Sequence, residues 1–170
     1  MSVFILLIVD IMINPNPQTI FDFFSSSNAK LSVPIYQRKY QWGISHLEEL
    51  ISDLHESMSS SKPLFLGNFI FDTHNPECYD IIDGQQRITT LSLLIVALRE
   101  RAKQLNQPKL VAALQGRLTF IDQLGEEKWS RVIVSSSIKE LYQYIIMEDR
   151  DWIFVSNINW VSVKKQINKI

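Results

Sequence analysis

Residues 79–91 read YDIIDGQQRITTL, and this stretch decides how the chain folds. Ile81 and Ile82 end an apolar run of the kind that forms a buried strand. The pair Asp83-Gly84 that follows favours a tight turn. Two glutamines, an arginine and two threonines come next, before an apolar run long enough for a buried helix. A strand that leads through a polar turn into a helix N-terminus forms an anion site, because the first backbone N–H groups of a helix have no internal partner. The stretch therefore predicts a phosphate-binding turn.

Within this motif, three side chains are candidates for catalysis. Arg87 offers a planar guanidinium that suits phosphate or carboxylate. Gln85 or Gln86 could orient a water for in-line attack on a phosphate. Two roles stay open for Asp83: it binds a divalent ion such as Mg²⁺ beside substrate phosphates, or it fixes Arg87 and touches no ligand. We expect catalytic roles for Asp83, Gln86 and Arg87. The plain alternative is a turn and a helix cap with Arg87 in a salt bridge.

Length and composition restrict the class of protein. With 170 residues, 46% of them hydrophobic, the chain can bury a core and fits one domain or one domain plus an appendage. A net charge of -1 gives no global basic field for nucleic acid. The single cysteine, Cys78, excludes an internal disulfide, and no Cys/His cluster has zinc-ligand spacing. We expect a cytoplasmic protein.

The first nine residues are apolar and resemble a signal peptide at first sight. They lack a basic region, Asp10 interrupts them, and they are too short to cross a bilayer. We therefore expect residues 1–18 to be a leader or a disordered terminus, with Met12 as an alternative start, and no membrane anchor.

The rest of the pattern predicts an α+β fold. Helices are expected over 20–24 behind a Thr19 cap, from a Ser45–Glu48 capping box to about 58, and over 88–104, 108–124 and 138–146. Strands are expected over 31–33, 64–72, 78–83 and 131–134. The second and third strands form a hairpin, and Gly67 marks a bulge or a close backbone approach. These elements suggest a compact unit over 19–105 and a mainly helical extension over 106–170.

A second motif places cations between aromatic side chains. Residues 35–42 read IYQRKYQW. Such a stretch can stack a base and hold phosphates. Alternatively, it is an exposed strand whose cations lie along aromatic core residues. The candidate ligands for phosphate are Tyr36, Gln37 and Arg38, and the candidates for stacking on a base or on DNA are Tyr40 and Trp42.

Three segments, residues 33–42, 65–68 and 83–90, together resemble the N-terminal domain of GmrSD-type modification-dependent restriction endonucleases. The resemblance covers about residues 19–105. It implies a ParB/sulfiredoxin-like fold, in which a small mixed sheet and a few helices hold a nucleotide at a strand–turn–helix. It also implies NTP binding and hydrolysis, with Mg²⁺, coupled to cleavage of modified phage DNA. Chains of this family usually run longer, so the extension is expected to be a shortened form.

The resemblance also implies roles for individual residues. The phosphate loop corresponds to Asp83, Gly84, Gln85, Gln86 and Arg87, with Thr89 and Thr90 opening the helix. The first motif, with Tyr36, Gln37, Arg38, Tyr40 and Trp42, would face the same cleft.

Two departures from the family pattern narrow the expected function. The 170 residues contain no His-rich ββα-metal signature of the HNH type, since the histidines are only His46, His55 and His74. DNA cleavage by that route is therefore not expected here, and a separate nuclease subunit is the expected partner. The loop has glutamines where sulfiredoxin chemistry needs a cysteine, so that activity is not expected.

The competing function is a non-catalytic module that senses DNA or binds a partner through the same cleft. Apolar helices after residue 88 also leave room for a homo-oligomer.

Overall fold

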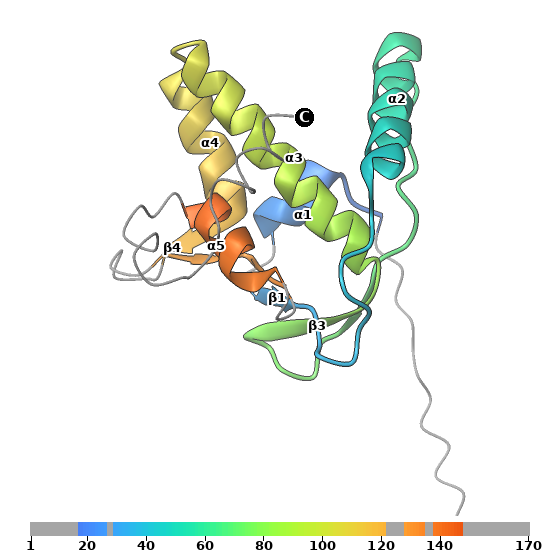
Figure 1. Cartoon of the computed structure of the whole chain (residues 1–170), viewed down its shortest axis with the longest axis vertical. Coiled ribbons are helices and arrows are strands. Elements are labelled where there is room, and N and C mark those ends of the chain that lie inside the picture. Colours follow the sequence, from blue (N-terminus) through green and yellow to red (C-terminus); the bar gives the residue numbers. More distant parts are fainter. Residues whose placement is uncertain (1–16, 27–28, 122–127, 135–137, 148–170) are drawn as a thin grey trace, which may run out of the picture.

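The computed structural model describes residues 17–26, 29–121, 128–134 and 138–147 (Figure 1). Its helices are α1 (Ile20–Ser26), α2 (Ile44–Ser60), α3 (Gln85–Gln104), α4 (Pro108–Leu118) and α5 (Lys139–Met147). Its strands are β1 (Lys30–Ser32), β2 (Ile70–Asp72), β3 (Cys78–Asp83), β4 (Thr119–Ile121), β5 (Lys128–Ser130) and β6 (Val132–Ile133). Of the expected leader over residues 1–18, residues 1–16 lie outside the described residues.

The α+β prediction is confirmed by a small mixed sheet. Its strand order is β2-β3-β1-β6, with β1 parallel to both β3 and β6 and with β2 antiparallel to β3. A separate pair, β4-β5, is antiparallel. The segment expected to be a mainly helical extension thus also adds strands, and its β6 completes the main sheet beside β1. The ParB/sulfiredoxin likeness stays a prediction.

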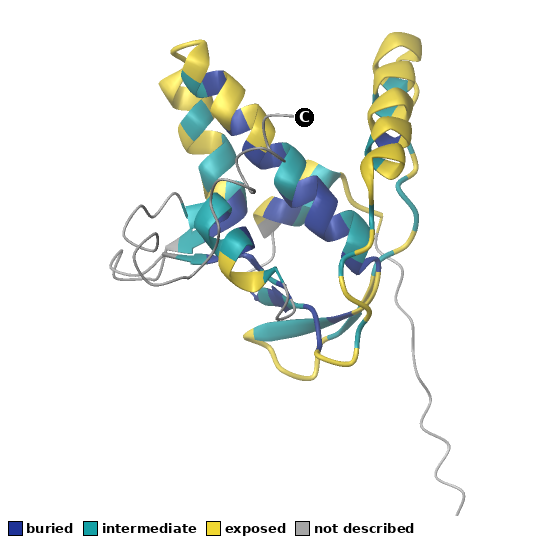
Figure 2. Cartoon of the chain, in the orientation of Figure 1, coloured by how far each residue is buried: buried dark blue, intermediate teal, exposed yellow. Residues whose placement is uncertain are grey.

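Helix α3 runs through the middle of the molecule, and its lower half is buried (Figure 2). The prediction of a buried helix after the motif is therefore confirmed for this part of α3. The segment 88–96 contributes Ile88, Leu91, Ile95 and Val96 to one core cluster, which also receives Phe24, Leu31, Ile81 and Tyr142 from other elements. Because β3 leads directly into α3, the motif between them is anchored on both sides by the core.

The start of α3 differs from the prediction. The helix begins at Gln85 and not at Ile88, so the glutamines and Arg87 form its first turn and are not a loop before it. Gly84 is the N-cap with φ 91°, a conformation in which glycine has no steric cost. A Cβ on Gly84 would lie 2.4 Å from Cδ1 of Phe69. Only glycine therefore fits at the junction of β3 and α3.

The predicted strand over 64–72 is wrong for its first six residues, because only Ile70–Asp72 forms β2. The carbonyls of Leu66 and Asn68 instead accept hydrogen bonds from the guanidinium of Arg87. Gly67 between them has φ 82° and touches the same guanidinium, so the expected close backbone approach is confirmed. The predicted hairpin is present as β2 and β3.

Two helix boundaries also differ. The predicted capping box of Ser45 and Glu48 is wrong, since α2 begins at Ile44 and its N-cap is Gly43, whose N–H donates to Nδ1 of His46 (3.3 Å). The helix predicted to reach residue 124 ends at Leu118, because the next three residues pair with β5. The predicted cap of α1 by Thr19 and the predicted strand near residue 132 are both present.

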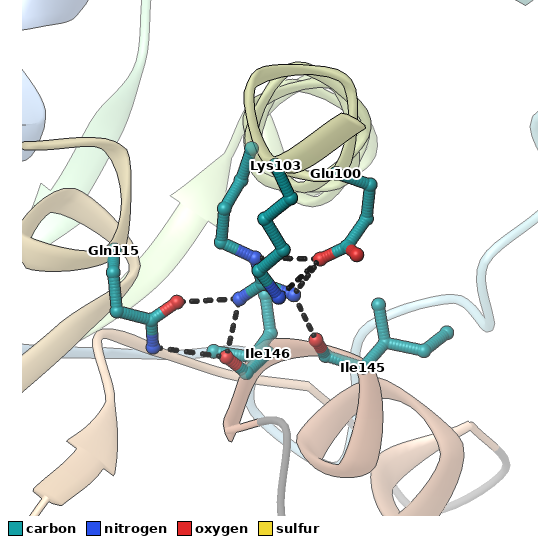
Figure 3. A network of polar contacts seen from close by, with 6 residues as sticks. Glu100, Lys103, Gln115, Ile145 and Ile146 are labelled. Carbon is teal, nitrogen blue, oxygen red and sulfur yellow. Dashed lines mark hydrogen bonds and ion pairs between the residues drawn. The ribbon is translucent and has the colours of Figure 1, made fainter. Parts of the chain in front are cut away.

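A buried arginine joins α3 to α4 and α5 (Figure 3). Arg99 donates to the carbonyl oxygens of Ile145 and Ile146, at 3.0 Å each, near the C-terminus of α5. It also donates to Oε1 of Gln115 in α4 and, at 2.9 Å, to Oε1 of the neighbouring Glu100. The last carbonyls of α5 lack helical partners, so this guanidinium both caps α5 and holds three helices together.

Two exposed side chains at the β2–β3 turn, those of Asp72 and His74, shift each other's pKa. The Asp72 carboxylate accepts from the backbone N–H of His74 (3.0 Å) and contacts its Nδ1. The side-chain hydrogen bond to Asp72 raises the pKa of His74 above its ordinary value. The backbone hydrogen bond from His74, followed by the side-chain one, lowers the pKa of Asp72.

We expect Gly84→Ala to destabilise the fold by about 2–4 kcal/mol, because it adds backbone strain and a clash with Phe69. Gly116→Ala is the matched control: it lies in α4 with nothing within 4 Å of the added Cβ, and should stabilise by roughly 0.5–1 kcal/mol. Urea unfolding measures both variants. Equal effects would show that the junction tolerates a side chain.

Asp72→Asn should return the pKa of His74 towards its ordinary value, as measured by NMR titration of the ring. The favourable pair exists where Asp72 is ionised and His74 is protonated. It is therefore lost as the pH rises through the raised His74 pKa, and again as it falls through the lowered Asp72 pKa. An unchanged His74 titration in the variant would contradict this pairing.

Candidate functional site

Three segments meet at the first turn of α3. They are the loop that follows β1, the segment before β2, and the end of β3 with its glycine turn. The side chains of the first three α3 residues, Gln85, Gln86 and Arg87, each bind the backbone of another segment. The site is therefore built outward from this turn.

The two glutamines hold the loop that carries the aromatic–cation motif. Nε2 of Gln85 donates to the carbonyl of Arg38 (3.0 Å) and to Oε1 of Gln37 (3.3 Å). Gln86 makes two opposed bonds: its Oε1 accepts from the N–H of Gln41 (2.8 Å), and its Nε2 donates to the carbonyl of Lys39 (3.1 Å). A primary amide can satisfy a backbone donor and acceptor in this way, as a neighbouring strand would. The loop is thus fixed across the helix N-terminus.

Gln37 ties the same loop to the strand. Its Nε2 donates to the carbonyl of Ile82 (2.9 Å), and its backbone N–H closes a turn onto the carbonyl of Pro34 (3.0 Å). This residue therefore serves the architecture of the site.

Arg87 faces the segment before β2. Besides the bonds to the carbonyls of Leu66 and Asn68, its guanidinium lies over the ring of Phe69, 4.9 Å from the centroid. Nη2 is 3.6 Å from Oδ2 of Asp83. The second of the two roles foreseen for Asp83, fixing Arg87, is thus present as a long ion pair. The planar donors of Arg87 hold backbone carbonyls, which is a positioning role.

The inner members of both motifs point into the protein. Tyr40 and Thr90 share a hydrogen bond between their hydroxyls (2.8 Å), and Oγ1 of Thr90 also donates to the carbonyl of Gln86 (2.8 Å). Trp42 stacks on the ring of His46, with centroids 5.6 Å apart, and packs against the core. Thr89 is buried beside a cavity of about 10 Å³ that also borders Tyr40 and both glutamines, with room for about one water. These residues do not form an open stacking surface.

The outer members are exposed. Tyr36 is 71% accessible, and its neighbour Ile35 is exposed as well. Arg38 and Lys39 are also exposed, although their backbone carbonyls are held by the glutamines. Asp83 lies at the same edge, with its side chain 64% accessible. Two exposed cations and one exposed carboxylate therefore belong to segments that meet at the N-terminus of α3.

That N-terminus retains its donors. Gly84 has no side chain to cap the helix, and no capping hydrogen bond reaches the first turn from the described residues. Uncapped N–H groups and the helix dipole both favour an anion. Among the described residues there is no group of three acidic, histidine or cysteine side chains that could hold a metal unaided. None of the helices in this part of the chain is long and apolar enough to cross a membrane.

Sequence reasoning placed the two motifs at one site, where the structure brings them together, but it did not identify what most of their residues contact. It treated Gln85 and Gln86 as ligands of a phosphate or a water, whereas their amides bind the backbone of the other motif. The two adjacent glutamines, in a sequence with two other polar segments, were one available signal, but this signal does not identify the backbone groups that the glutamines bind.

The sequence model of one family, described as the GmrSD restriction endonuclease N-terminal domain, matches residues 20–169. No curated protein matches the chain.

We expect Gln86→Ala to release the loop, because Gln41 loses the acceptor of its N–H and Lys39 the donor to its carbonyl. The amide of Gln41 should lose its hydrogen-exchange protection, and the free energy of unfolding should fall by about 1–2 kcal/mol. Gln104→Ala at the opposite end of α3 is the control and should leave that amide protected. Unchanged protection in Gln86→Ala would show that something else holds the loop.

Proposed function

Since this chain belongs to the GmrSD restriction endonuclease N-terminal domain family, and is thus a domain of a restriction system, we propose that it binds a nucleoside triphosphate at the N-terminus of α3 and hydrolyses it. Hydrolysis would be coupled to DNA cleavage by a nuclease, carried on a separate subunit. A ParB/sulfiredoxin-like arrangement of the fold is part of the same proposal.

The observation that carries the proposal is the uncapped first turn of α3 with Arg38 and Lys39 held beside it. Backbone N–H groups contact phosphate oxygens without a side chain in between. Arg38 adds a forked guanidinium, and Lys39 adds a point charge. The hydrogen bonds from Gln85 and Gln86 fix the backbone from which these two exposed side chains extend. Together they provide donors on two sides of a phosphate group.

The structure separates binding residues from positioning residues in this proposal. Asp83 is exposed at the edge of the turn and fits the single carboxylate that Mg²⁺ commonly takes when substrate phosphates supply the other ligands. When bound there, the ion would neutralise charge on the phosphates. Arg87 would act through the segment before β2, whose backbone it holds, and Gln86 through the loop.

Water for hydrolysis requires an orienting group. Both amide atoms of Gln86 are engaged with the loop backbone. The amide nitrogen of Gln85 is engaged in the same way, while its oxygen has no hydrogen bond to the described residues. We therefore assign the orienting role to Oε1 of Gln85 in place of Gln86.

A second candidate function is DNA contact by the loop around Tyr36. It is favoured by the exposure of Ile35 and Tyr36 next to two cations, since exposed aromatic and basic side chains bind nucleic acid. Such binding would be independent of nucleotide and would weaken steeply with salt.

Calorimetric titration with GTP, ATP and CTP in the presence of Mg²⁺ tests the main proposal. Wild type should bind at least one of them, and Arg38→Ala should weaken that binding by about 10-fold or more through loss of a charged phosphate contact. Arg101→Ala, an exposed arginine in the last turn of α3, is the matched control and should bind normally.

Absence of binding for every nucleotide would contradict the proposal. Phosphate release should accompany binding, and Gln85→Glu should lower both affinity and phosphate release, because a carboxylate cannot donate to the carbonyl of Arg38. A salt-sensitive DNA shift without nucleotide binding would instead favour the second function.

A further inference from the structure

Helix α2 carries an apolar column of which one edge is half-buried against the protein and the other edge is exposed. Ile44, Leu47, Ile51, Leu54 and Met58 recur at alternating spacings of three and four, the a and d positions of a heptad pattern. We call these five residues the α2 seam. Its d positions, Leu47 and Leu54, are half-buried, whereas its a positions are exposed: Ile44 67%, Ile51 52% and Met58 80%.

The rest of the described chain leaves the a positions of this column uncovered. Figure 1 shows α2 standing apart from α3 and α4, and Figure 2 shows it exposed along most of its length. Its single buried residue is Leu50, which joins the core cluster and fixes the inner face of the helix. Apolar side chains repeated every seven residues on a solvent-facing helix mark a contact with another helix.

The seam is complementary to itself in one orientation. If a two-fold axis passes beside Ile51, two antiparallel copies of α2 place Ile51 against Ile51 and set Ile44 opposite Met58 of the second copy. The three exposed apolar residues then all meet apolar partners. A two-fold contact of this kind uses the same patch on both copies.

The charges along the seam favour the same orientation. Glu48 and His55 both lie on the outer edge of the exposed column, and both are exposed. In the antiparallel pair, Glu48 falls within one residue of His55 from the second copy. A carboxylate of one copy then lies beside an imidazole of the other. In a parallel pair, Glu48 would face the Leu50–Ser57 edge, which offers no charged partner.

We propose that the α2 seam is the contact between two copies of this chain, which pair antiparallel through α2. A helix of 17 residues spans about 25 Å. One such helix pair buries less than the roughly 1,200 Å² of a standard-size interface, so the dimer should be weak, with a Kd between about 1 μM and 1 mM. This contact lies on α2, away from the nucleotide site, and does not depend on it.

Sedimentation over a concentration series tests the pairing with the full chain. Wild type should pass from monomer to dimer, and Ile51→Glu should raise Kd by at least ~10-fold because two carboxylates would meet on the axis. Leu98→Glu is the matched control, since Leu98 is 51% accessible on α3, and it should dimerise like wild type. Circular dichroism confirms that both variants remain folded.

Cysteine cross-linking tests the orientation, in a Cys78→Ser background because Cys78 is the single native cysteine. Ile51→Cys should form a disulfide-linked dimer by itself. Ile44→Cys and Met58→Cys should cross-link when mixed and not separately. A chain that stays monomeric at every concentration, a dimer unaffected by Ile51→Glu, or separate cross-linking of the residue 44 and residue 58 variants would each overturn the proposal.

Discussion

The bonds from the side chains of one helical turn to the backbones of other segments hold this structure together at its functional end. Gln85, Gln86 and Arg87 follow Gly84, which has a left-handed conformation and no room for a side chain beside Phe69. Their side chains satisfy backbone groups of two segments that form no regular strand or helix at those points. Because buried or half-buried backbone groups must find partners, these bonds take the place of sheet pairing. The loop with the exposed cations is held by the bonds of the two glutamines together with those of Gln37 and Tyr40.

This arrangement separates two tasks within one motif. The side chains of the first α3 turn position the surrounding segments, while its backbone N–H groups have no side-chain cap from Gly84. Binding of a phosphate there would use the backbone of α3 and the exposed side chains of the neighbouring loop. Substitutions in the motif would thus affect binding through loop geometry as much as through lost contacts. Stability and ligand affinity should therefore be measured on the same variants.

Much of the fold was predictable because hydrophobic periodicity reports burial directly. The largely apolar run after Ile88, the hairpin before it and the amphipathic pattern near Tyr142 all correspond to elements of the structure. The boundaries that differed depend on contacts distant in sequence. Residues 64–69 read as a strand, but Arg87, 19 to 21 residues away, takes their carbonyls. The amide of Gln86 reaches a backbone group 45 residues away, which no local pattern encodes. The α2 stripe was visible in the sequence, but which of its columns faces solvent depends on where Leu50 meets the core.

The central claim is that the N-terminus of α3 receives the phosphates of a nucleotide. It is tested most directly by NMR, following the backbone amides of Gln85, Gln86 and Arg87 while a nucleoside triphosphate and Mg²⁺ are added. The account predicts that these three amides shift first and furthest, together with those of Arg38 and Lys39. A nucleotide that binds while leaving these amides unmoved, with shifts confined to another part of the chain, would contradict it.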